Sequence, residues 1–163
     1  MPSIKNKILT RRLLQGAGVI VALAGIASLL PSPFGEVRKT RGSGMLLQGE
    51  QADTALRTAV DRACSNCHSN ETKWPWYADV APVSWIIRQH VIDGREHLNF
   101  SEWLKPGETK FTSWSDLEDI CKAVQNNSMP LFGYDWVHSS AKLAPADRQA
   151  ICAWVNSAIA NAR

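Results

Sequence analysis

The sequence predicts an all-α protein, with one long apolar helix at the N-terminus and a small helical domain after it. Apolar residues recur every three or four positions in three separate stretches, which is the spacing of a helix that buries one face. These stretches run from Glu50 to Ala63, from Ser115 to Val124 and from Pro145 to Ile159. An 18-residue run without a charge, Leu13 to Leu30, predicts the N-terminal helix.

Length and composition indicate one leader and one folded domain. The chain has 163 residues, and roughly 100 to 150 residues is the common size of a domain with a single hydrophobic core. Residues 35–49 hold four glycines among charged and small residues, which is typical of a flexible tether. We therefore expect a signal or membrane anchor at residues 1–34, a tether at 35–49 and the folded domain at 50–163.

The charge distribution argues against nucleic-acid binding. The chain carries 18 Lys and Arg against 15 Asp and Glu, but four of the cations and none of the acids lie in residues 1–30. The remainder has 14 basic against 15 acidic residues, a net charge of −1. Binding to nucleic acid needs a concentrated basic surface that displaces counterions from phosphate. No partner of that class is expected.

The apolar run is long enough to remain as a membrane anchor. A single span needs about 17 to 25 residues, and three glycines make this run only weakly hydrophobic. No small-x-small cleavage site follows it, so we expect an uncleaved single-pass anchor in a bacterial inner membrane. Cleavage and release into the periplasm is the alternative.

The orientation of the anchor follows from its flanking charges. Lys5, Lys7, Arg11 and Arg12 precede the run and favour a cytoplasmic N-terminus, with the domain in the periplasm. Three further cations soon follow it, at residues 38, 39 and 41, and weaken the signal.

Cys64, Cys67 and His68 form a C-x-x-C-H motif, the signature of haem c attachment. Two thiols three positions apart, where a helix begins to turn, reach the two vinyl groups on one edge of a porphyrin. The next residue then brings an imidazole to the iron. Export supports this interpretation, because free thiols would otherwise pair in an oxidising compartment. The same string occurs in zinc sites, so a structural zinc site made with a further histidine is an alternative.

The second axial ligand is expected to be Met129. It is the one methionine in the predicted domain, since Met1 and Met45 lie in the leader and the tether. It stands 61 residues after His68 and directly before Pro130, which favours a non-helical conformation at Met129. Methionine with histidine is the pairing that raises the reduction potential. A core-filling methionine is the alternative.

Three other histidines compete for the iron. His90 falls on the apolar face of a helix expected to start at Pro82, and such a histidine is more often a core residue. His97 and His138 would reach the iron from loops. Ligation of the iron by two histidines would give a lower reduction potential than ligation by histidine and methionine.

The remaining cysteines, Cys121 and Cys152, lie on two further predicted helices. The first starts with the capping box Ser115 to Glu118, and the second starts near Pro145. A disulfide between them would join these helices in an oxidising compartment, and two buried free thiols are the alternative.

A longer pattern surrounds these motifs, from about Thr54 to Ile159. It comprises the string from Cys64 to Tyr77, Ala81 to Trp85, Gly94 and Arg95, His97 to Trp103, Met129 and Pro130, and the final-helix residues Asp147, Arg148, Ile151 and Trp154. This pattern resembles the haem-binding domain family, a bacterial relative of class I cytochromes c with a single haem.

The resemblance implies a cytochrome c-like helical domain with one covalent haem c, ligated by His68 and Met129. It also makes five residues candidates to hydrogen-bond or pair with the haem propionates: Trp76, Tyr77, Trp85, Arg95 and Asn99. Packing around the cofactor is their alternative role.

These expectations point to an electron carrier that works by outer-sphere transfer, and not to an enzyme. No separate acid-base constellation or site for a small-molecule substrate stands out in the sequence. A haem-based sensor or peroxidase-like protein with an open or labile sixth site is the alternative, and Met129 distinguishes the two. The expected partners are the membrane and redox proteins near it, such as a respiratory complex or another periplasmic cytochrome.

Overall fold

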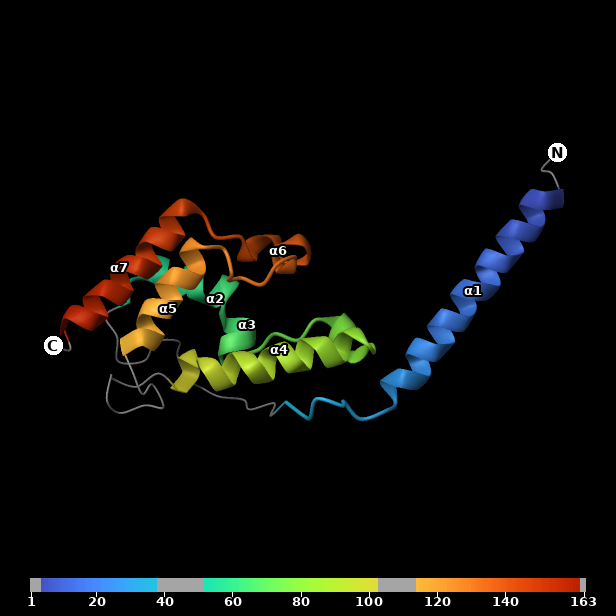
Figure 1. Ribbon diagram of the computed structural model, residues 1–163, viewed down its shortest axis with the longest axis horizontal. Coiled ribbons are helices and arrows are strands. Elements are labelled where there is room, and N and C mark those ends of the chain that lie inside the picture. The colour runs from blue at the N-terminus through green and yellow to red at the C-terminus, as the bar shows by residue number, and fades with distance from the viewer. Residues whose placement is uncertain (1–3, 38–51, 103–113, 162–163) are drawn as a thin grey trace. The chain divides into compact units, whose positions relative to one another are not determined.

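The computed structural model describes residues 4–37, 52–102 and 114–161 (Figure 1). Within these ranges the chain forms seven α-helices and three short 3-10 helices and contains no strand. The predicted all-α class is therefore confirmed for the described part of the chain.

The chain divides into two compact units. The first comprises residues 1–37 and 74–90, and the second comprises residues 38–73 and 91–163. Helix α4 (Val83–His97) begins in the first unit and ends in the second. Most of the predicted tether lies outside the described residues, so the domain boundaries at residues 34 and 50 stay predictions.

In the first unit, α1 (Ile4–Ser28) contains the cations and all but the last two residues of the apolar run. Its segment Asn6–Ser28 is 23 residues long with a mean hydropathy of 1.3, which is enough to cross a membrane or to serve as a signal sequence. The Ser28 hydroxyl accepts a hydrogen bond from the Ala81 amide at 2.9 Å. Farther along, Arg88 pairs with Glu36 at 2.9 Å, and a short 3-10 helix, η1, spans Trp76–Asp79.

In the second unit, α2 (Thr54–Ala63) leads into the C-x-x-C-H motif as predicted. The helix begins at Thr54 and not at Glu50, because the Asp53 side chain caps it and accepts a hydrogen bond from the Leu56 amide at 2.7 Å. Leu56, Ala59, Val60 and Ala63 are buried along the expected face.

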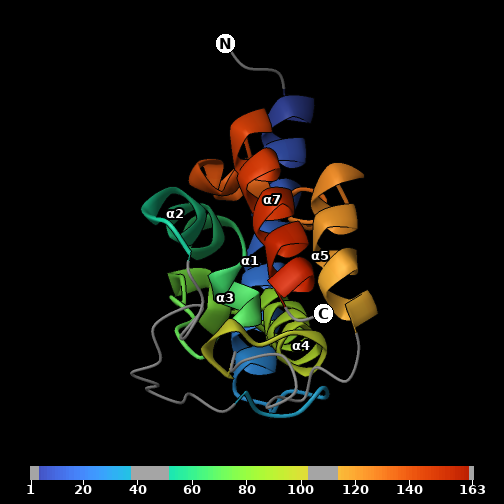
Figure 2. The ribbon, with the colours of Figure 1, turned by 90° about the vertical axis from the view of Figure 1, so that its left-hand side faces the viewer.

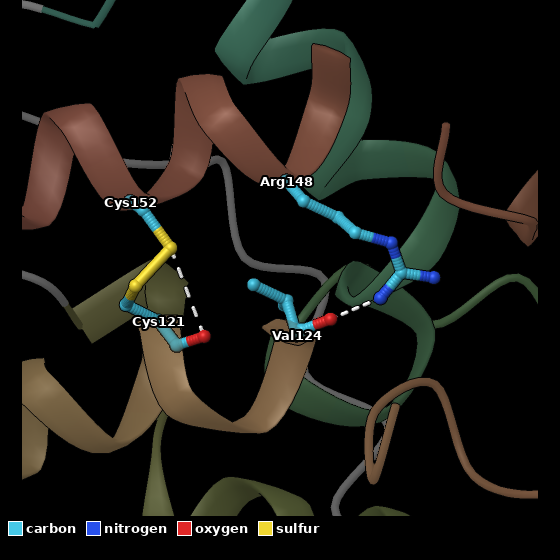
Figure 3. The surroundings of a disulfide bond; sticks show 4 residues. All are labelled: Cys121, Val124, Arg148 and Cys152. Atoms are coloured by element: carbon cyan, nitrogen blue, oxygen red, sulfur yellow. Dashed lines mark hydrogen bonds between the residues drawn. A yellow bond between two sulfur atoms is a disulfide. The ribbon is translucent and has the colours of Figure 1, made fainter. Parts of the chain in front are cut away.

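Helices α5 (Trp114–Gln125) and α7 (Pro145–Asn161) lie side by side in both ribbon views (Figures 1 and 2). Helix α5 starts at Trp114, so Ser115 lies inside the helix. The capping-box prediction required Ser115 to be the N-cap and is therefore wrong. At the other end of α5, the Arg148 guanidinium donates a hydrogen bond to the Val124 carbonyl (Figure 3). A cation there satisfies a carbonyl that has no partner within its own helix.

A disulfide between Cys121 and Cys152 joins these two helices (Figure 3). The bridge that the sequence favoured over two free thiols is thus present. Cys152 Sγ also lies 3.7 Å from the Cys121 carbonyl oxygen, which is a close contact and not a hydrogen bond, because a disulfide sulfur carries no proton.

The hydrophobic core of the second unit lies between α2, α5 and α7. Its fully buried side chains include Val60, Phe100, Ile151 and Val155. Four short elements complete this unit: α3 (Ser65–His68), η2 (Phe100–Glu102), α6 (Tyr134–Val137) and η3 (Ser139–Ala141). Gly133 enters α6 with φ of 81°, a conformation that favours glycine.

Candidate functional site

The C-x-x-C-H motif occupies the turn where α2 ends and α3 begins. The Cys64 amide still donates to the Val60 carbonyl at 2.9 Å, while the Cys64 carbonyl accepts from the His68 amide at 2.9 Å. Cys64 therefore caps both helices, and the chain turns at the position that the motif predicts. Cys64 and Cys67 are half-buried free thiols and are not joined to each other.

The His68 imidazole is held by a backbone acceptor. A carbonyl oxygen can only accept, so His68 Nδ1 donates its proton to the Leu98 carbonyl at 3.1 Å. The edge of the ring also meets Phe100, with the ring centroids 6.4 Å apart. This leaves Nε2 unprotonated, which is the arrangement that fixes the tautomer of a metal-ligating histidine. Burial lowers the pKa of His68, which favours the neutral, ligating form.

Both thiols lie in surroundings that disfavour the thiolate. Burial raises the pKa of Cys64 to about 12 and also raises that of Cys67. A structural zinc site needs deprotonated thiols that converge with other ligands. Every Cys and His of the chain lies in the described ranges, and no three His, Cys, Asp or Glu residues there form a group able to hold a metal ion. The donor set fits attachment through two thioethers better than the zinc alternative.

Gly94 lets α4 pass close to the motif. A Cβ atom at this position would stand 2.6 Å from the Cys67 carbonyl oxygen and 3.2 Å from Cys67 Cβ. Real Cβ atoms do not approach a backbone oxygen this closely. The family resemblance included Gly94, but its role as a contact point follows only from the structure.

Two of the five candidate propionate ligands brace the loop that follows His68. Arg95 Nε donates to the Ser69 carbonyl at 2.9 Å, and its Nη2 donates to Thr72 Oγ1 at 3.0 Å. Asn99 Nδ2 donates to Asn70 Oδ1 at 3.0 Å. These bonds position the backbone next to His68, so Arg95 and Asn99 have a structural role here.

The other three candidates, Trp76, Tyr77 and Trp85, belong to the first unit. Trp76 is 80% exposed, and its ring meets Tyr77 edge to face with the centroids 5.7 Å apart. Contacts of all five residues with propionates stay predictions.

Asn66, the second variable residue of the motif, connects three parts of the site. Its carbonyl accepts from Thr72 Oγ1 at 2.7 Å, and its Oδ1 accepts from the Lys73 amide at 3.0 Å. Its Nδ2 donates to the Tyr134 hydroxyl at 2.9 Å. The sequence pattern gives Asn66 no role, because the motif leaves this position open and no spacing rule links Asn66 to its partners.

Met129 is half-buried in the segment after α5, where its amide donates to the Ala123 carbonyl at 3.1 Å. It lies beyond the end of the helix, as expected for a residue before proline. Tyr134, five residues later, reaches the motif through Asn66. Ligation of one iron by His68 and Met129 stays a prediction.

The competing histidines have different surroundings. His90 is exposed, so its expected place in the core is wrong. The buried side of α4 runs instead through Ser84, Val91 and Gly94, because small residues allow the close approach. His97 is exposed, with Nδ1 2.8 Å from the Asp93 carbonyl oxygen, and His138 stacks on Tyr134 with the ring centroids 4.3 Å apart.

Comparison with known proteins gives one result. The family model of the haem-binding domain matches residues 31–157, more than three quarters of the chain. A search of curated proteins and a search of solved structures found no significant match. The matched segment contains the whole C-x-x-C-H site and Met129, and the chain therefore belongs to the haem-binding domain family.

Proposed function

We propose that this protein is a single-haem c-type cytochrome that carries electrons by outer-sphere transfer. The observation that supports it most is the orientation of His68, which is half-buried and held through Nδ1 by the Leu98 carbonyl, while burial lowers its pKa. In a haem-binding family, a histidine oriented in this way directly after two free thiols fits the proximal ligand of a covalent haem.

Each residue of the site has a distinct role in this proposal. Cys64 and Cys67 attach the haem through thioethers, His68 ligates the iron on one face and Met129 ligates it on the other. The bound haem supplies the one-electron ferric and ferrous couple. The protein contributes two fixed ligands and partial burial, which set the potential.

Two protein ligands on the iron favour electron transfer over catalysis, because no coordination position then stays open for a substrate. Helix α1 suits a single-pass anchor that holds the domain on the periplasmic side of a bacterial inner membrane. A protein held there meets redox partners at the membrane surface. A respiratory complex and another periplasmic cytochrome are the proposed partner classes.

The first experiment is absorption spectroscopy of oxidised and reduced protein, made in a host that attaches haem c, with a haem-stained denaturing gel. Haem that stays on the chain after denaturation would support covalent attachment. Sharp reduced bands with the weak far-red band of methionine sulfur on ferric iron would support the electron carrier. A protein without haem would refute the proposal.

A second experiment tests the sixth ligand. Met129→Ala should keep its stained haem, lose the far-red band, lower its potential and bind carbon monoxide readily when reduced. Met45→Ala is the matched control, because Met45 precedes the predicted domain and should change none of these. Rapid carbon monoxide binding by the unmodified protein would favour the sensor or peroxidase-like alternative.

A further inference from the structure

We propose that the hydrogen bond between Tyr134 and Asn66 is a latch that holds the Met129 segment next to the haem-attachment motif and so keeps the sixth ligand on the iron. Tyr134 and Asn66 are positioning residues in this proposal, because they act through Met129. The inference rests on the proposed function, since it takes Met129 as the sixth ligand.

The latch connects two segments far apart in sequence. Asn66 and Tyr134 are separated by 68 residues, and the Asn66 Nδ2 to Tyr134 hydroxyl distance is 2.9 Å. Asn66 lies between the two attachment cysteines, so its backbone would be fixed to the haem on both sides. Tyr134 is the first residue of α6 and follows Met129 by five positions. The bond therefore joins the part of the chain nearest the proximal ligand to the part that carries the distal ligand.

Asn66 is a rigid partner for this bond. The Lys73 amide donates to Asn66 Oδ1 at 3.0 Å, which fixes the amide plane and directs Nδ2 towards Tyr134. Thr72 Oγ1 donates to the Asn66 carbonyl at 2.7 Å. Because the Asn66 side chain is already held at Oδ1, it loses little further conformational freedom when Nδ2 binds Tyr134.

The segment between Met129 and Tyr134 is held at its start by α5 and forms a turn at its end. The Met129 amide donates to the Ala123 carbonyl at 3.1 Å, and the Tyr134 amide donates to the Leu131 carbonyl at 3.0 Å. On its other side, the Tyr134 ring stacks on His138, with the ring centroids 4.3 Å apart. Without the bond to Asn66, the stretch from Met129 to Tyr134 would be held by its Ala123 end and its local turns, and farther along the chain by the bonds from Arg62 to the Ser140 and Lys142 carbonyls.

The expected effect is a change in the population of protein without the sixth ligand. A hydrogen bond between neutral groups typically changes an equilibrium constant, here the one between the ligated and the ligand-free form, by about 3- to 10-fold. Without the bond, we expect the ligand-free fraction to rise by that factor. The rate at which reduced protein binds carbon monoxide should rise by the same factor, because binding requires the open form.

The test uses the full chain with its haem and three variants. Tyr134→Phe removes only the hydroxyl, and Asn66→Ala removes the amide. Asn66→Asp keeps an oxygen for the Lys73 amide and offers the other to the Tyr134 hydroxyl, which can donate instead of accept. Thr58→Ala is the control, because it removes an exposed hydroxyl whose bond stays within α2.

We expect Tyr134→Phe and Asn66→Ala to keep stained haem, to show a weaker far-red band and to bind carbon monoxide about 3 to 10 times faster. Asn66→Asp and Thr58→Ala should behave as the unmodified protein. A purely structural role for Tyr134 would lower the melting temperature of Tyr134→Phe without changing ligand binding.

The outcomes separate this inference from the proposed function. An unmodified protein without haem or without the far-red band would refute the proposed function itself. An unmodified protein with the band, together with a Tyr134→Phe variant that binds carbon monoxide at the same rate, would overturn only the latch. Loss of covalent haem from both Tyr134→Phe and Asn66→Ala would overturn it too, because the bond would then serve attachment.

Discussion

Gly94 lies where α4 comes closest to the motif, and its missing side chain is what permits the contact. Gly94→Ala would place a methyl group 2.6 Å from the Cys67 carbonyl oxygen, where the neighbouring atoms are backbone and cannot swing away. Overpacking of this kind costs about 1 to 3 kcal/mol. We expect a lower melting temperature and less haem per chain, measured by thermal unfolding and by haem stain against total protein.

The control for Gly94 is Glu96→Ala, a nearby exposed position on the same helix. This variant should retain the haem content and the melting temperature of the unmodified protein. Equal behaviour of the two variants would show that α4 can move away from Cys67 at little cost.

Asp147 connects the start of α7 to α2. Its carboxylate pairs with Arg62 and accepts a hydrogen bond from the Ala144 amide at 2.6 Å. The hydrogen bond from Arg62 is the main reason that the pKa of Asp147 is lowered. A carboxyl group with a lowered folded-state pKa stabilises the protein above its unfolded pKa of about 3.9. That contribution is lost as the pH falls through the lower folded-state pKa.

Asp147→Asn should therefore reduce the free energy of unfolding at pH 7 by about 1 to 3 kcal/mol. The difference in the free energy of unfolding between the variant and the unmodified protein should shrink in strongly acidic solution. There the Asp147 carboxyl is protonated and, like the asparagine, carries no charge. Denaturant unfolding at a series of pH values measures both effects. Asp119→Asn is the control, because Asp119 pairs with Lys122 at 3.8 Å through a side chain that is 70% exposed. This variant should lose less than about 1 kcal/mol of the free energy of unfolding.

At the scale of elements, the disulfide is the one covalent link between α5 and α7. It closes a loop with a sequence separation of 31 residues, which corresponds to roughly 3 to 4 kcal/mol of stabilisation through the unfolded state. The double variant Cys121→Ala with Cys152→Ala should lose about that much, measured by denaturant unfolding of the haem-loaded protein.

A thiol reductant provides the matched experiment for the disulfide. It should destabilise the unmodified protein by a similar amount and leave the double variant unchanged, because thioethers to haem are not cleaved by thiols. Two titratable thiols at Cys121 and Cys152 in unfolded protein that has met no reductant would mean that the bridge is absent in solution.

The helices differ in how well their sequence patterns predict their packing. The stripes of α2 and α7 end up buried as expected, because apolar residues recur there at helical spacing. The apolar stripe of α4 predicted its buried side poorly, because Ser84 and Gly94 lie on that side together with Val91. Val83 and Ile86, the larger apolar residues, are 44% and 51% exposed.

At the scale of the whole molecule, the proposed role of α1 is to hold the protein at the membrane. If the helix is retained as an anchor, the haem-containing chain should sediment with membranes, resist extraction by alkaline carbonate and retain Met1 or Pro2 as its first residue. Fractionation with N-terminal sequencing measures this. A soluble haem protein that begins near residue 31 would instead indicate a cleaved signal.

The orientation of the anchor needs a separate measurement. Protease added to cells without their outer membrane should digest the haem domain if it lies in the periplasm. Protection of the domain under these conditions, with digestion after lysis, would contradict a periplasmic location.

The sequence by itself determined the helical class, the N-terminal apolar helix and the C-x-x-C-H motif, because each depends on residues close together in the chain. Short-range spacing also placed Met129 outside a helix. Only the tertiary structure showed the acceptor for His68 Nδ1, the need for Gly94 and the bond from Asn66 to Tyr134. These contacts join segments that are between 27 and 68 residues apart, and their existence depends on how the helices pack and not on any local pattern.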